Sequence, residues 1–294
     1  RDKHVTGVQT CALPIYLATL IGMGVLAGGA TAAGFAVDPN ILSWESLPAN
    51  LLLVQAWGLA PQAGWNHPSW SISAEWFAYL TFPLFAWAAL ALKARPLVAV
   101  ALAALFMAVL YAGFETWAGH PLTLATIRWG ALRIVPCFAL GCALHSLWRE
   151  RAGPGRNSAM AGAAISGAVA LIAAATALSD TIIVLATGGL IFYLARMAQA
   201  GSTVLSARPL IYLGEISYSI YMVCVPWKIV FVNGATSLLK LEGGQLPWPL
   251  WCVFLAGVVP LAAISYHLIE KPARTHMKLW AEMWKGRAPT VAGA

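Results

Sequence analysis

Two ionisable side chains interrupt the long apolar segments of this sequence, and they are the first candidates for chemistry. Glu75 lies in the segment Trp70–Leu92, and Arg133 lies in the segment Trp129–Trp148. An ionised group inside a bilayer costs roughly 2.5–3.5 kcal/mol on insertion scales, so each should face the protein and find a partner. We expect the two to pair, with Glu75 as a catalytic or orienting carboxylate and Arg133 as its electrostatic anchor. The alternatives are an ion pair that only joins two helices, or an Arg133 side chain that extends to the membrane surface.

Polar residues surround Glu75 at helical spacing. Ser71, Glu75 and Tyr79 are four residues apart and share one helix face, and Ser73 lies in the same block. We therefore predict that Ser71, Ser73 and Tyr79 bind substrate beside the carboxylate.

A second polar stripe lies late in the chain. Ser217, Tyr221, Cys224 and Lys228 follow +4, +3 and +4 spacing, and Tyr218 is adjacent to the first of them. Such a stripe is typical of a lined cavity, and we predict that Ser217, Tyr218, Tyr221 and Cys224 contact substrate. Hydrogen bonding between packed membrane helices accounts for the pattern equally well.

The elements that must position these residues are membrane-spanning helices. Of 294 residues, 60% are hydrophobic and 10% charged, and the mean hydropathy is +0.73; soluble domains have about 45–50% apolar and about 25% charged residues. The apolar runs approach the roughly 20 residues that cross a bilayer. They predict an all-α, polytopic bundle with eight spans: Tyr16–Val37, Trp70–Leu92, Leu97–Thr116, Trp129–Trp148, Ser158–Leu178, Thr181–Met197, Pro209–Val232 and Trp248–Glu270.

The distribution of charge predicts an orientation and excludes one class of partner. Lys and Arg collect in every second loop, which places the C-terminus in the cytoplasm. The net charge of +7 is spread over short loops rather than gathered in a patch, so we expect no nucleic-acid partner. Leu47–Leu59 is too short to span and predicts an interfacial or re-entrant helix, with ordinary loop packing as the alternative. Trp280 and Trp284, with nearby lysines, give the tail 275–294 the pattern of an amphipathic surface helix.

No metal or nucleotide site is expected. The five cysteines contain no CxxC pair, and the sequence lacks HExxH, Walker-type, GxGxxG and GxSxG motifs.

The first fifteen residues have a different character from the rest. Val5–Ile15 resembles the translation of a common sequencing-library adapter. We therefore expect residues 1–15 to be a non-native lead-in, the bundle to occupy 16–274, and the native protein to begin further upstream.

Several of these segments together resemble the acyltransferase-3 family of integral-membrane O-acyltransferases. Trp70–Pro83 is similar to the family's WSLSxEWxFYLxFP block, and Leu213–Pro226 is similar to LGxISYSIYLxHxP. Glu270–Arg274 matches ExPxR, and Arg133 with Phe138 and Gly141 matches a middle R…FxxG. The first block is the most specific of the four.

The resemblance implies transfer of an acyl group, usually acetyl, from acetyl-CoA or another acyl-CoA to a hydroxyl of a cell-envelope glycan or lipid-linked sugar in the bacterial inner membrane. The family is expected to have about ten spans, with an Arg and a catalytic His on the first two. Neither is expected in this chain, which would leave it inactive. Relatives usually have His where this sequence has Cys224. The alternatives that the residues leave open are a transporter or flippase of a polar or lipid-linked solute, and a bundle whose polar groups serve only packing.

Overall fold

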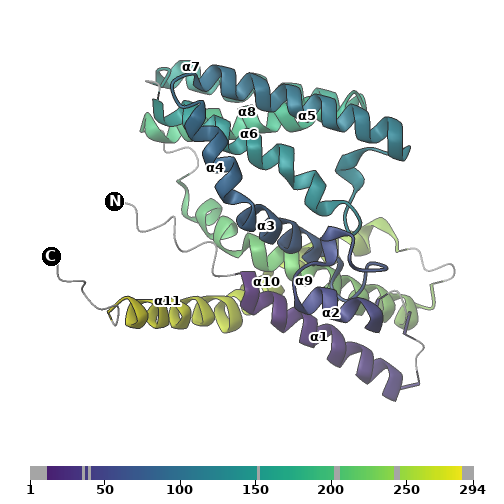
Figure 1. Ribbon diagram of the computed structural model, residues 1–294. Helices are drawn as coiled ribbons and strands as arrows, with labels where there is room; N and C mark the ends of the chain where they lie inside the picture. The colour runs from purple at the N-terminus through teal and green to yellow at the C-terminus, as the bar shows by residue number, and fades with distance from the viewer. Residues whose placement is uncertain are drawn as a thin grey trace. The chain divides into compact units, whose positions relative to one another are not determined.

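Long apolar helices make up the structure, a computed structural model that describes residues 12–34, 37–38, 41–150, 153–201, 206–241 and 246–286 (Figure 1). Seven of them are long and apolar enough to cross a membrane, and a bent pair makes an eighth when counted as one span. The helices are α1 (Ala12–Ala32), α2 (Leu47–Leu51), α3 (Trp70–Leu80), α4 (Phe82–Ala91), α5 (Pro96–Ala118), α6 (Gly130–Glu150), α7 (Arg156–Ala175), α8 (Asp180–Gln199), α9 (Arg208–Leu239), α10 (Trp248–Ser265) and α11 (Lys271–Gly286).

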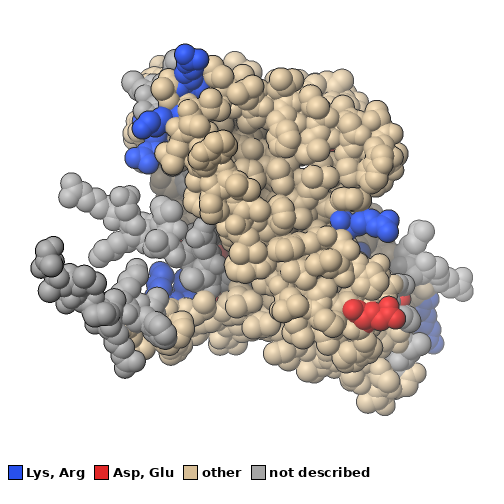
Figure 2. Space-filling view, in the orientation of Figure 1, with Lys and Arg blue, Asp and Glu red and all other residues tan. Residues whose placement is uncertain are grey.

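The surfaces of these helices fit a lipid environment. In each of the seven spans only 11% to 33% of the most apolar window is buried within the protein. On the face shown in Figure 2, the described residues are mostly other than Lys, Arg, Asp and Glu. A water-soluble bundle would keep one polar face on each such helix. The chain is therefore an all-α polytopic membrane protein, as the composition predicted.

The predicted span Trp70–Leu92 is broken. α3 and α4 meet at an angle of 55° around Thr81. Pro83 lies in the first turn of α4 and has no N–H to continue the hydrogen bonding of α3. The Thr81 hydroxyl donates instead to the carbonyl of Phe77 at 2.8 Å, which caps the end of α3.

The chain divides into two compact units. The central unit comprises residues 45–62 and 70–208, and the terminal unit comprises residues 1–44, 63–69 and 209–294. In the central unit, buried Ala103, Met107 and Tyr111 of α5 pack against α6. In the same unit α7 packs along α8, where a Cβ on Gly162 would lie 2.6 Å from the Tyr193 ring, so only glycine allows this approach.

The prediction of one helix over Leu47–Leu59 is wrong. The segment instead forms α2, a turn at Leu53, and a short 3-10 helix, η3 (Gln55–Trp57). Leu53 has a φ of 57°, a left-handed conformation that ends a helix. Asn50, Gln55 and Ala56 are buried, so the segment is a packed loop of the central unit.

Several helix bounds differ from the sequence prediction. α1 begins at Ala12, four residues before the predicted span, while residues 1–11 of the predicted lead-in lie outside the described part of the chain. α9 extends seven residues beyond the predicted end at Val232, to Leu239. The predicted tail begins within α11, and residues 287–294 also lie outside the described residues.

Candidate functional site

The polar face predicted around Glu75 is present on α3. Glu75 and Tyr79 are both exposed, and the Tyr79 hydroxyl donates to Glu75 Oε2 at 3.3 Å. Ser71, one turn earlier, is half-buried. Their four-residue spacing accounts for this shared face. The result is a carboxylate with a phenol beside it on a helix whose other polar side chains are the two serines Ser71 and Ser73.

The expected ion pair between Glu75 and Arg133 is not formed. Within the described residues of the central unit, Arg133 donates from Nη1 to the carbonyl of Ala125 at 3.2 Å, and its guanidinium lies 4.7 Å from the centre of the Trp70 ring. α3 packs against α6 and η3 through its buried face, which carries Ala74 and Ala78. Glu75 lies outside that face, so the packing that brings Trp70 to Arg133 turns the carboxylate elsewhere. Arg133 is thus a neighbour of the Trp70 block but not a partner of its acid.

Ser73 occupies a structural position rather than an open one. Its side chain is fully buried, and Ser73 Oγ accepts a hydrogen bond from the Ala56 backbone N–H at 3.0 Å. Trp57 Nε1 donates to the Ser73 carbonyl at 2.9 Å. Both bonds fasten η3 to α3, so Ser73 positions the Trp70 block from behind.

The second predicted stripe lies on α9 in the terminal unit. Ser217 is exposed and donates to the Gly214 carbonyl of its own helix at 2.8 Å. Tyr218 is half-buried, and the Cys224 thiol is partly buried and free of any disulfide. Tyr221 is 37% exposed, and its hydroxyl donates to the Pro68 carbonyl at 2.8 Å. Tyr221 therefore joins α9 to the segment that contains Pro68.

The segment bonded to Tyr221 carries a histidine, His67, that is not among the site residues predicted from the sequence. Asn66 is fully buried, and its Nδ2 donates to the Met222 carbonyl at 2.9 Å. His67 therefore lies between two residues that are each tied to α9, and its own side chain is exposed. A fixed backbone with an exposed imidazole is suited to presenting that ring in a defined position. The signal was present in the sequence, since His67 precedes the Trp70 block by three residues.

The residues Glu270–Arg274, which the sequence marked only as a short motif, form a buried charged cluster at the start of α11. Glu270 is 1% exposed and accepts hydrogen bonds from Ser219 Oγ at 2.6 Å and from Arg274 Nη2 at 2.8 Å. The last bond is an ion pair, and Ser219 is itself fully buried. The two late motifs, the one around Ser217–Tyr221 and the ExPxR sequence, are thus joined in the terminal unit.

A π-helical turn sets the direction of Glu270. Residues Tyr266–Glu270 form the turn η7 between α10 and α11, and α1 packs against it. Such turns hold one extra residue per turn and are frequent at functional sites. Beside it, the Tyr212 hydroxyl and His267 Nε2 lie 3.2 Å apart and share a hydrogen bond. The turn therefore carries two polar links between α9 and the end of α10.

The described residues contain no group of three His, Cys, Asp or Glu side chains that could hold a metal ion. The polar side chains described above are carboxylate, phenol, hydroxyl and imidazole groups, which can act in proton transfer and nucleophilic catalysis.

Comparisons with known proteins agree on one family. The family model of the acyltransferase domain, type 3, matches residues 12–267. Acyltransferase MdmB of Streptomyces mycarofaciens is 31% identical over 278 residues, which cover 87% of this chain and 67% of that protein. No solved structure matches. These matches favour the acyltransferase interpretation over a transporter.

Proposed function

Because this chain belongs to the acyltransferase-3 family of membrane acyltransferases, we propose that it moves an acetyl or similar acyl group from acyl-CoA to a hydroxyl group. The proposed acceptor is a cell-envelope glycan or a lipid-linked sugar. The proposed location is the bacterial inner membrane, with the C-terminus in the cytoplasm, because Lys and Arg gather in alternate loops.

The observation that carries the proposal is the pair Glu75 and Tyr79 on α3. A carboxylate on a spanning helix is costly wherever it meets acyl chains, so such residues border a polar path or a substrate. Glu75 is exposed, and the hydroxyl of Tyr79, one turn away on the same helix, donates a hydrogen bond to its carboxylate at 3.3 Å. A helix that needed the charge only for packing would bury it against a partner, as Glu270 is buried against Ser219 and Arg274.

The chemistry assigned to these groups is transfer from a thioester. The acceptor hydroxyl oxygen attacks the thioester carbonyl carbon, the C–S bond breaks, and the CoA thiol leaves with an ester formed. Glu75 would orient the acceptor hydroxyl, or accept its proton and pass that proton to the departing CoA sulfur so that CoA leaves as the thiol. Tyr79 would stabilise the carboxylate through its hydrogen bond. Ser71 would contact substrate from the same face. Arg133 would act through position, because it holds Trp70 at the start of the block.

The terminal unit carries a polar set of its own. Tyr221 and Asn66 fix the segment around His67 onto α9, and we assign Tyr221, Tyr218 and Ser217 to contacts with a substrate. Cys224 lies one turn after Tyr221 on the same stripe and is assigned to the same set. Ser73, being buried and bonded to η3, is assigned to support of the block instead.

The test uses membrane vesicles from bacteria that express the complete reading frame. Vesicles are given acetyl-CoA labelled in the acetyl group, and base-labile label in the glycan and lipid fractions is measured together with free CoA. Transfer predicts label in one of these fractions and CoA released in equal amount, above vesicles that lack the protein. Solute movement with no CoA release would contradict the proposal and support transport.

A further inference from the structure

The last helix, α11, has the form of a membrane-surface helix. It continues from α10 through the π-turn η7 and carries four basic residues and one acidic residue over Lys271–Gly286. The continuous apolar run ends at Ile269 in η7, immediately before Glu270 and Lys271, so a span that begins in α10 would meet the membrane boundary near the start of α11. Among the described elements, the main contacts of α11 are with η7, the turn that directly precedes it in the chain. Figure 1 shows α11 as the last helix before the C-terminus.

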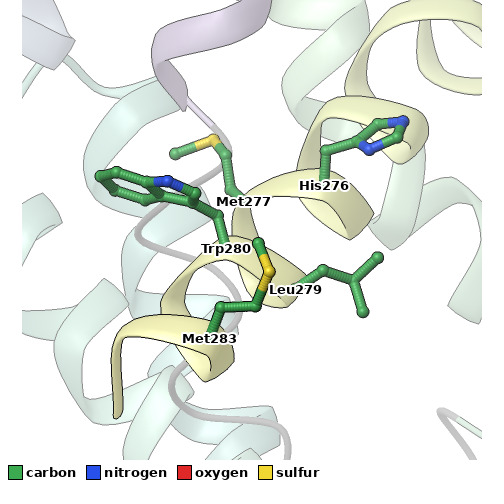
Figure 3. A pocket seen from close by; sticks show the side chains of 5 residues that line it. All are labelled: His276, Met277, Leu279, Trp280 and Met283. Carbon is green, nitrogen blue, oxygen red and sulfur yellow. The ribbon is translucent and has the colours of Figure 1, made fainter. Parts of the chain in front are cut away.

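Apolar and basic side chains lie on different sides of α11. Lys271 and Lys278 are seven residues apart and therefore share one face, and both are exposed. Met283 lies about 140° around the helix from Lys278, at 100° per residue, and is 57% exposed. Figure 3 shows the apolar side in detail: one open hollow is lined by His276, Met277, Leu279, Trp280 and Met283. Leu279 and Trp280 are 52% and 61% exposed.

We propose that α11 lies in the plane of the membrane and binds an anionic lipid surface, on the leaflet from which α10 emerges. A helix with this division buries its apolar side about 5–10 Å into the headgroup boundary. The basic side then meets anionic headgroups, each Lys contributing about 1 kcal/mol near such a surface. A bilayer is the favoured occupant because α10 already places it beside the first turn of α11.

The cluster at Glu270 fastens this anchor to the body of the terminal unit. Arg274, in the first turn of α11, is ion-paired at 2.8 Å to Glu270, and Glu270 accepts from Ser219 on α9. The ion pair and hydrogen bond connect the position of α11 to the helix that carries the Ser217–Tyr221 segment. Binding of α11 to lipid would thereby set the depth of that segment in the membrane.

The experiment places a fluorescent label on each side of α11 in the full chain. In a background with all five cysteines replaced by alanine, Met283→Cys and, as the matched control, Lys278→Cys are each labelled with bimane. The protein is reconstituted in vesicles of phosphatidylcholine with zero to 40% phosphatidylglycerol. Quenching by a nitroxide lipid and by aqueous iodide is measured at each position.

The proposal predicts that the nitroxide lipid quenches the label at position 283 at least twofold more than the label at position 278. Iodide should instead quench the label at position 278. Phosphatidylglycerol should raise the lipid quenching at 283. The substitution Lys271→Gln, which removes one positive charge, should weaken this effect of phosphatidylglycerol on lipid quenching about fivefold, the equivalent of about 1 kcal/mol. Equal iodide quenching at both positions would overturn the proposal. The proposal would also be overturned if position 283 were protected from both quenchers and this protection increased with protein density. That result would indicate that a second copy of this chain covers the apolar side of α11.

A second measurement avoids the cysteine replacements. Hydrogen exchange of the unaltered chain in the same two lipid compositions should slow in residues 275–286 when phosphatidylglycerol is present. Exchange in α11 that is insensitive to lipid charge would contradict the proposal.

Discussion

Ser219 Oγ donates a hydrogen bond of 2.6 Å to Glu270 Oε2, although the two residues are 51 positions apart in the sequence. Both side chains are almost completely buried. A buried carboxylate is tolerated when donors satisfy it, and here a serine and an arginine do so from two different helices. This bond is what joins α9 to the start of α11.

Removing the serine donor should destabilise the terminal unit. Ser219→Ala leaves Glu270 with one donor fewer in a buried position, and we expect a loss of about 1–3 kcal/mol in the free energy of unfolding. The measurement is unfolding of the purified protein in detergent micelles. Ser217→Ala is the matched control, because its exposed hydroxyl bonds only to its own helix, and it should change stability by less than about 0.5 kcal/mol. Equal effects from the two variants would contradict this account.

Close packing at the start of α6 predicts a sharp difference between two glycines of that helix. A Cβ on Gly130 would lie 3.0 Å from Ala56 Cβ and 3.1 Å from Trp70 Cε3, so Gly130→Ala must displace η3 or the Trp70 block. We expect a loss of about 1–3 kcal/mol in stability. Gly141→Ala meets no atom within 4 Å and should be neutral or stabilising by up to about 1 kcal/mol. Thermal unfolding of both variants in one detergent decides the matter, and a tolerated Gly130→Ala would show that the crossing is loose.

The stacking of Arg133 on Trp70 predicts an energetic coupling. In a double-mutant cycle of Arg133→Met and Trp70→Leu, we expect a coupling of about 0.5–2 kcal/mol, because the guanidinium lies 4.7 Å from the ring centre. Trp87, which is 72% exposed on α4, provides the control cycle with Arg133 and should show none. A coupling no larger than that of the control would mean that Arg133 has another role.

The spans were predictable from sequence because the length and composition of an apolar segment are local properties. The direction of the polar groups was only partly predictable. Spacing alone put Glu75 and Tyr79 on one face, and the structure confirms that relation. The predicted pairing of Glu75 with Arg133 was wrong, because it depends on which face of α3 packs against α6, and spacing within one helix does not determine that face.

Local backbone features account for the remaining differences. The break at Thr81 follows from Pro83, and the loss of a helix over Leu47–Leu59 follows from the left-handed Leu53. Contact between Ser219 and Glu270 depends on the π-turn, which alters the angle at which every later residue leaves the helix. A prediction that assumes 3.6 residues per turn gives the wrong direction for the side chains after the π-turn. The sequence therefore showed Glu270 and Arg274 only as part of a short motif.

The most direct test of the central claim compares two carboxylates in the acyl-transfer assay. Glu75→Gln should lower the kcat/KM for acetyl-CoA by about 100-fold or more, the usual contribution of a positioned acid or base. Glu115→Gln, which changes an exposed carboxylate at the far end of α5, should leave it unchanged in the same vesicles. Tyr79→Phe, which removes the hydroxyl donor to Glu75, should fall between them. If Glu75→Gln retains the turnover of the unaltered protein at equal membrane abundance, then Glu75 takes no part in the reaction and the proposed site is wrong.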